Sequence, residues 1–176
     1  MRKLNLDNFK KGQSGISPKF AETMLEAAIF CLTENGHKSG VILKIDGYIK
    51  EEIQLFWSIE INNQIKRSWQ DLKEAAEYGA TALGALLISY FEHLEAYERI
   101  PPNGDADYFL QDISTKQITA LLEVSGIWKK SPTNTADIRV NIKKKRLDDS
   151  EYASTYPIYI VVTEFSEPKS KINKYD

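Results

Sequence analysis

Residues 156–165, Tyr-Pro-Ile-Tyr-Ile-Val-Val-Thr-Glu-Phe, restrict the fold of this chain more than any other segment. Nearly every side chain in the run is β-branched or aromatic, which favours a strand, and apolar side chains fall on both of its faces. A strand of this kind is expected at the centre of a sheet that is covered on both sides. The run therefore predicts an α/β fold.

Periodicity and turn signals divide the rest of the chain into helices and strands. In chain order we expect a helix over residues 17–35, a hairpin of strands over 41–45 and 53–61, a long helix over 71–94, strands over 96–100, 108–110 and 118–124, and a helix over 135–147. This last helix is expected to turn Ile138, Ile142 and Leu147 inward and a basic face outward. As a crossover, it lets the strands on either side of it lie parallel.

The 176 residues are expected to form one domain. We divide the chain into a flexible arm at 1–16, a helix and hairpin extension at 17–70, a core at 71–165 and a loose polar tail at 166–176. The arm lacks the apolar centre of a secretory signal, and no run is long enough to span a bilayer. We therefore expect a cytoplasmic protein that does not bind membranes.

Charge and cysteine content narrow the functions that the sequence allows. The net charge of −2 creates no general attraction to nucleic acid, so such binding must be local. Cys31 is the single cysteine, which excludes an internal disulfide and a cysteine zinc site. The two histidines, His37 and His93, lack the paired spacing of a zinc site. Glycine-rich phosphate loops and nucleophile elbows do not occur in the sequence.

Acidic residues interrupt two otherwise apolar strands between residues 103 and 126. Asp105 and Asp107 stand at the start of the first strand, and Glu123 lies within the second. If the strands are neighbours, these carboxylates can converge. A buried carboxylate is costly unless donors or a cation compensate, and a hard divalent cation would compensate well. The alternatives are a turn at the aspartates and a buried ion pair at Glu123.

The order of long helix, short strand, Gly-Asp-Ala-Asp strand, Leu-Leu-Glu-Val-Ser strand, helix and Ile-Tyr-Ile-Val-Val strand resembles the restriction-endonuclease-like core of the PD-(D/E)XK nuclease superfamily. The resemblance covers roughly residues 71–165. It implies a central mixed sheet flanked by helices, a bound Mg²⁺ or Mn²⁺, and hydrolysis of phosphodiester bonds in nucleic acid, with DNA as the first expectation. The N-terminal helix and β-hairpin would be an extension of this core.

Carried over to this sequence, the resemblance implies a set of metal ligands: Asp107 with Asp105 as its competitor, Glu123, the backbone carbonyl of Val124, and Glu77 or Glu74 from the long helix. Ser125 stands where the superfamily has the Lys that orients the attacking water. A hydroxyl supplies no charge, so the cation must come from elsewhere. The candidates are Lys129, Lys130, Arg139 and Lys143. We assign catalysis to Asp107, Glu123, Ser125 and Lys143.

Asp107-Tyr108, Leu-Glu-Val-Ser-Gly at 122–126 and Phe-Ser-Glu-Pro at 165–168 are also similar to a bacterial family in which Ser125 would be a shared trait, in the setting of defence or mobile elements. Two other functions stay open. The core could act without catalysis as a scaffold for nucleic acid, for a protein partner or for a second copy of the chain. A small-molecule binding domain would instead require a deep apolar pocket.

Overall fold

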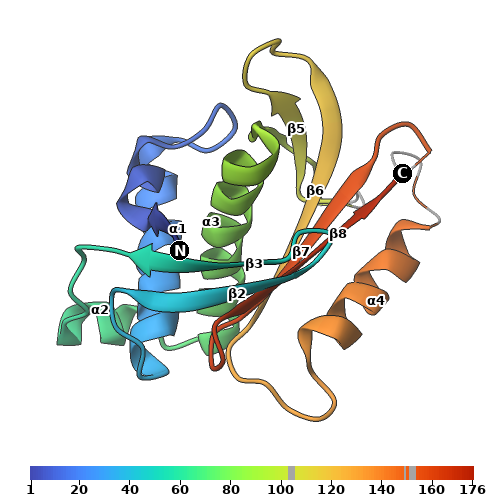
Figure 1. Ribbon diagram of the computed structural model, residues 1–176. Helices are drawn as coiled ribbons and strands as arrows, with labels where there is room; N and C mark the ends of the chain where they lie inside the picture. The colour runs from blue at the N-terminus through green and yellow to red at the C-terminus, as the bar shows by residue number, and fades with distance from the viewer. Residues whose placement is uncertain (103–105, 149, 151–153) are drawn as a thin grey trace.

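Eight strands form one mixed sheet in the computed structural model, which describes residues 1–102, 106–148, 150 and 154–176 (Figure 1). The strands lie in the order β1-β3-β2-β8-β7-β6-β5-β4. Their bounds are β1 Arg2–Asn5, β2 Val41–Gly47, β3 Glu51–Phe56, β4 Leu94–Arg99, β5 Tyr108–Asp112, β6 Ile118–Ile127, β7 Ile158–Glu164 and β8 Lys169–Tyr175. The α/β class and the central mixed sheet are therefore as the sequence predicts.

Helices cover the two faces of this sheet. Their bounds are η1 Leu6–Lys11, a 3₁₀ helix, then α1 Pro18–Glu34, α2 Asn63–Ser68, α3 Leu72–Glu92 and α4 Ala136–Leu147. α1 and α3 pack together on one face, and α4 lies on the other (Figure 1). The α-helices begin where a side-chain oxygen caps the first turn, at Ser17, Asn62, Asp71 and Thr135. None of the helices in the described part of the chain combines the length and apolar character that a membrane crossing requires.

The run at residues 156–165 forms the central strand β7, all of which is buried. Ile158, Ile160 and Val162 pack on the side of α4, whereas Tyr159 and Val161 face the core built by α1 and α3. β7 lies parallel to β6, and α4 is the crossover between them. The predicted central strand, whose two apolar faces require cover on both sides, is confirmed. The predicted parallel pairing through a helical crossover is confirmed as well.

The inward face of α4 differs from the prediction. Ile138 and Ile142 are 36% and 45% exposed, while Ala136, Val140 and Leu147 are buried. Residues four and eleven positions apart share a helix face, so the small Ala136 and the branched Val140 and Leu147 pack on the sheet. The expected inward positions of the two isoleucines were wrong, and that of Leu147 is confirmed.

The tail predicted to be loose is an interior strand, which corrects that prediction. β8 lies between β2 and β7, parallel to the first and antiparallel to the second. Ser170 and Ile172 are fully buried, and the hydroxyl groups of Thr163 and Ser170 lie 2.8 Å apart. Lysines alternate with these two residues, and Ile172 is the one large apolar side chain that β8 buries. The apolar alternation by which a strand is recognised is therefore weak in this segment.

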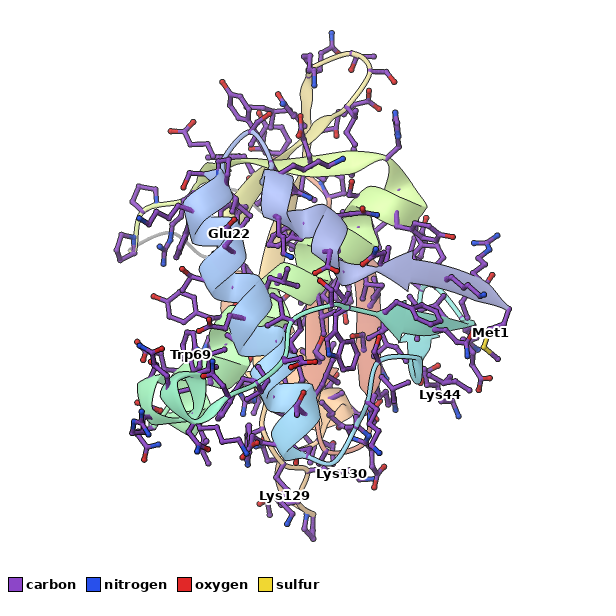
Figure 2. The ribbon with its side chains drawn as sticks, turned by 90° about the vertical axis from the view of Figure 1, so that its left-hand side faces the viewer. Met1, Glu22, Lys44, Trp69, Lys129 and Lys130 are labelled. Atoms are coloured by element: carbon purple, nitrogen blue, oxygen red, sulfur yellow. The ribbon has the colours of Figure 1, made fainter. Side chains whose placement is uncertain are left out.

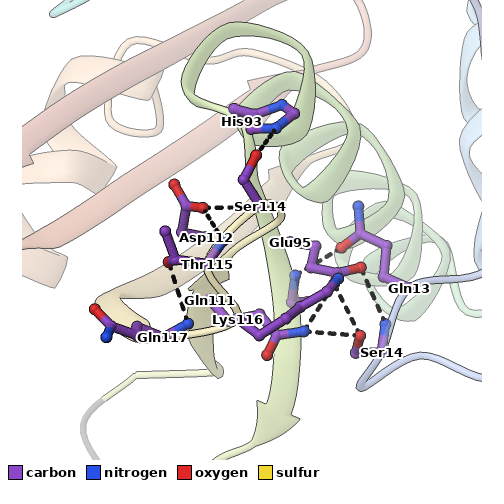
Figure 3. A network of polar contacts seen from close by, with 11 residues as sticks. Gln13, Ser14, His93, Glu95, Gln111, Asp112, Ser114, Thr115, Lys116 and Gln117 are labelled. Atoms are coloured by element: carbon purple, nitrogen blue, oxygen red, sulfur yellow. Dashed lines mark hydrogen bonds and ion pairs between the residues drawn. The ribbon is translucent and has the colours of Figure 1, made fainter.

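The segment predicted to be a flexible arm is also built into the fold. β1 pairs in parallel with β3, and a few apolar side chains of this polar segment are buried: Leu4, Leu6, Phe9 and Ile16. The loop after η1 is held by β4 (Figure 3): Ser14 donates to Glu95 at 2.9 Å, and Gln13 accepts from the amide of Ala96 at 2.8 Å. These contacts are with residues about 80 positions away, which local patterns cannot reveal.

α2 and α3 are separate helices that meet at Trp69. Figure 2 views the molecule from the side of α1 and shows Trp69 next to that helix. The indole nitrogen of Trp69 donates to Glu26 at 2.9 Å, and the ring lies 5.9 Å from that of Tyr78. Trp69 therefore fixes the N-terminal end of α3 against α1.

Candidate active site

Asp107, Glu77 and Glu123 meet along the side of β6 that faces β5, just beyond the first residue of β5. β5 pairs with β6 as far as Tyr108, which lies opposite Leu122. The next two amides on that side of β6 donate to carboxylates instead: Val124 to Asp107 Oδ2 at 2.8 Å, and Gly126 to Glu77 Oε2 at 3.2 Å. Both carboxylates are thereby held against the strand edge.

Asp107 is fixed through its backbone as well as its side chain. Its amide donates to the carbonyl of Leu122 at 2.9 Å, and its carbonyl accepts from the amide of Ile100 at 2.9 Å. The half-buried carboxylate therefore has a defined position just before β5, beside Glu123 of β6. Asp105, its competitor in the sequence, lies outside the described residues.

Glu123 is the most perturbed acid of the site. It is 7% exposed, and burial together with the nearby charge of Asp107 raises its pKa to about 8. Lys143 opposes this rise, because its Nζ lies 2.5 Å from Glu123 Oε1. The pKa remains raised because one ammonium does not outweigh both burial and a neighbouring carboxylate.

α4 brings two cations to the site from one face. Lys143 contacts Glu123, and one turn earlier Arg139 donates to Ser125 Oγ at 2.9 Å and lies 3.6 Å from Glu77 Oε1. Residues four apart on a helix rise about 6 Å, close to the distance between alternate residues of a strand. The pair on α4 therefore lies opposite Glu123 and Ser125, which share a face of β6.

Two clefts meet at Arg99 and Asp107. The first has a volume of about 440 Å³ and is lined by Phe20, Met24, Asp71, Lys73, Glu74, Glu77, Tyr78, Thr81, Arg99, Asp107, Tyr108 and Val124. The second, of about 280 Å³, is lined by Arg99, Ile100, Pro101, Pro102, Ala106, Asp107, Glu123, Lys143 and Arg146. The acid pair thus lies where a ligand passing from one cleft to the other would cross.

The structure brings together most of the residues assigned from the sequence: Asp107, Glu123, Val124, Ser125, Glu77 and Lys143. Glu74 lines the first cleft nearer the start of α3. Lys129 and Lys130 lie on the loop between β6 and α4, at the lower end of the molecule in Figure 2, and Lys130 is paired with Glu167 at 2.8 Å. Arg139 contacts Ser125 and Glu77, and Lys143 contacts Glu123, so these two are the sequence candidates that reach the site.

The donor set is suitable for a hard divalent cation. Asp107 and Glu123 supply carboxylate oxygens, and the carbonyl of Val124 points to the same side of β6 as its amide, toward Asp107. A cation would relieve the repulsion that raises the pKa of Glu123. Among the described residues, no group of three or more His, Cys, Asp or Glu side chains is arranged to hold a metal ion. A metal would therefore rely on two acids and a backbone oxygen, with Lys143 displaced from Glu123.

Of the cations and rings that line the clefts, the sequence led to Lys143 but did not assign Arg99, Phe20 or Tyr78 to the site. Arg99 pairs with Tyr108 across the β4–β5 hairpin, so the hairpin register could have placed it next to Asp107. Arg146 follows Lys143 by three residues and shares its helix face. Phe20 and Tyr78 come from α1 and α3, and no local signal relates these helices to the acids. Comparison of the chain with family models, with curated proteins and with solved structures found no match.

Proposed function

We propose that this protein is a metal-dependent nuclease with a restriction-endonuclease-like core, which hydrolyses phosphodiester bonds of nucleic acid. The observation that carries the proposal is the meeting of Asp107 and Glu123 in a cleft, where burial and mutual repulsion raise the pKa of Glu123 to about 8. Titratable groups perturbed in this way occur preferentially at functional sites. Two acids beside a backbone carbonyl favour the binding of a divalent cation.

The residues have distinct roles in the proposed reaction. Asp107, Glu123 and the carbonyl of Val124 would hold Mg²⁺ or Mn²⁺, which when bound neutralises phosphate oxygens and lowers the pKa of a water molecule. In the hydrolysis, the oxygen of a water molecule would form a bond to phosphorus as the bond from phosphorus to the leaving oxygen breaks; the water would lose a proton to solvent, and the leaving oxygen would gain one from solvent. Lys143, released from Glu123, stabilises the charge that develops on the phosphate.

Arg139 and Ser125 act as positioning residues in this proposal. Arg139 donates to Ser125 Oγ and lies beside Glu77, which in turn accepts from the amide of Gly126. Asn134 Oδ1 accepts from the second guanidinium nitrogen of Arg139 at 2.8 Å and fixes its orientation. These contacts hold the end of β6 in place, where the superfamily pattern would have its Lys.

The test is cleavage of labelled DNA and RNA, single-stranded and duplex, by the full chain in Mg²⁺, Mn²⁺ or a chelator. Glu123→Gln keeps the side-chain volume and removes the charge, so we expect its rate to fall about a hundredfold or more. Glu52→Gln, an exposed glutamate on β3, serves as the matched control and should cleave like the wild type. Equal cleavage by Glu123→Gln, or cleavage unaffected by the chelator, would contradict the proposal.

A second function, a non-catalytic scaffold with the same core, is favoured by a different observation. Lys143 already contacts Glu123 at 2.5 Å, and Arg139 contacts both Glu77 and Ser125. Cations of the protein itself thus already lie beside these two glutamates. In this case the wild type and Glu123→Gln would bind nucleic acid or a protein partner equally well, and neither would cleave.

A further inference from the structure

The two clefts that meet at the acid pair differ in the kind of surface that they offer. Phe20 and Tyr78 form a half-buried aromatic wall of the first cleft, and Met24, Tyr108 and Val124 form a buried apolar floor. The described residues of the second cleft supply three cations, Arg99, Lys143 and Arg146, and no aromatic ring. A nucleotide has the same two parts, an aromatic base and a charged phosphate.

The aromatic wall is held in place before any ligand binds. The ring of Tyr78 lies 5.8 Å from that of Phe20 and 5.9 Å from that of Trp69, both in edge contacts. Such pairs add to the stability that burial alone provides, and they fix the ring planes. Tyr78 is therefore supported by α1 and by the end of α2, while part of its surface remains accessible in the cleft.

The charged residues of the two clefts favour the same arrangement as their surfaces, with the base in the first cleft and the phosphate beside the second. The first cleft has four carboxylates and two cations among its described lining residues, so it disfavours a phosphate in its interior. The second cleft has three cations and two carboxylates. Arg99 lines both clefts beside Asp107, where a phosphate that follows a base bound in the first cleft would lie.

We propose that the substrate is nucleic acid with an unpaired nucleotide, whose base enters the aromatic cleft of Phe20 and Tyr78 while the adjoining phosphodiester lies over Asp107 and Glu123. This inference rests on the proposed nuclease function and adds the substrate class. Bases inside an intact duplex are stacked on their neighbours, so they cannot reach a recessed ring. Single strands and overhangs present bases that can stack on aromatic side chains. Arg146 would contact the backbone beyond the scissile bond.

Binding measurements in a Glu123→Gln background, where cleavage is expected to be slowed about a hundredfold or more, test the inference. A labelled single strand, the same sequence with a single-stranded overhang, and the blunt duplex are titrated and followed by fluorescence anisotropy. We expect the first two to bind about tenfold more tightly than the blunt duplex, because stacking of one base on an aromatic ring is worth an effect of about that size.

Substitutions of the ring locate the binding site. Tyr78→Leu should weaken single-strand binding about tenfold and leave duplex binding unchanged, whereas Tyr78→Phe, which keeps the ring, should bind like the parent. Tyr90→Leu is the matched control, since Tyr90 also lies on α3 and contacts an aromatic neighbour, Phe91, but does not line either cleft. Circular dichroism of each variant verifies that it is folded.

The outcomes separate the inference from the function on which it rests. If blunt duplex binds and is cleaved as well as the single strand, and Tyr78→Leu has no effect, the inference is overturned while a cleavage loss in Glu123→Gln still supports the nuclease. If no nucleic acid is bound or cleaved, the nuclease proposal fails, and the substrate class fails with it. Loss of binding in Tyr78→Phe as well as Tyr78→Leu would assign the effect to the hydroxyl or to packing and would overturn the stacking role.

Discussion

Two glutamates of this protein, Glu95 on β4 and Glu123 on β6, each contact one lysine, yet their surroundings shift their acidity in opposite directions. Lys116 lies 3.1 Å from Glu95, and Lys143 lies 2.5 Å from Glu123. Burial disfavours the charged form of both. The pKa of Glu95 is nevertheless below its ordinary value, whereas that of Glu123 is raised to about 8.

The other neighbours explain the difference. Ser14 and Gln111 donate to the Glu95 carboxylate at 2.9 and 2.7 Å, as Figure 3 shows, so donors surround its charge. Glu123 faces the carboxylate of Asp107 instead. Glu95, whose carboxylate accepts from several donors, stabilises the fold by anchoring the loop at Ser14 to β4. An acid that faces another acid leaves a negative site that a cation can occupy.

The largest expected effect in this comparison is the pH dependence caused by Glu123. Its folded pKa lies above the ordinary 4.5, so its contribution to stability is complete below about pH 4.5 and is lost as the pH rises through about 8. Glu123→Gln removes that loss. Relative to the wild type, we expect its free energy of unfolding to rise by about 4 kcal/mol between pH 5 and pH 9, since the loss extends over the roughly three pH units up to about 8 and each is worth about 1.4 kcal/mol.

Urea unfolding of both proteins from pH 5 to 9 measures this difference, since the two proteins differ only at residue 123. A wild type that gains stability relative to Glu123→Gln as the pH rises would show that Lys143 outweighs Asp107. In that case the pKa of Glu123 would be lowered in the folded protein, as that of Glu95 is, and the two glutamates would no longer differ.

A smaller effect with the opposite pH dependence is expected at Glu95. Its lowered folded pKa contributes stability above its ordinary pKa, and this is lost as the pH falls through the folded value. Glu95→Ala leaves the donors Ser14 and Gln111 without their acceptor, so we expect about 2 kcal/mol of destabilisation at pH 7. Glu98→Ala, an exposed glutamate on the same strand, is the control and should change little. An unaltered unfolding midpoint in Glu95→Ala would show that the loop does not depend on this acid.

The sequence alone predicted the elements whose signals are local. The N-cap Ser17 with Pro18 located α1, the apolar stripe located α3, and the run at 156–165 located the central strand. The acid pair was also accessible, because Asp107 stands just before β5 and Glu123 lies within β6, two strands that follow each other in the chain and whose acids were expected to converge if the strands were neighbours.

What the sequence missed depends on contacts between distant segments. β1 and β8 have too few apolar residues to be recognised as strands, and they are stabilised by pairing with β3, and with β2 and β7. Likewise, the sequence offered Arg139 and Lys143 of α4 only as two of four candidates for the missing cation. The packing face of α4, set by Ala136 and Val140, determines that Arg139 and Lys143 reach β6 while Ile138 and Ile142 stay exposed.

The smallest expected effect concerns Lys143, which contacts Glu123 as Lys116 contacts Glu95. Removing one partner of a buried ion pair is usually costly because a bare charge remains. Glu123 can instead take up a proton, since its pKa is already raised to about 8, and this limits the cost. Lys143→Met should therefore match the wild type in unfolding free energy at pH 5 and fall below it by about 1 kcal/mol at pH 9. Lys145→Met, on the exposed face of the same helix, is the control. Equal destabilisation of Lys143→Met at both pH values would mean that the lysine acts through packing, and its release to a phosphate would then have no electrostatic basis.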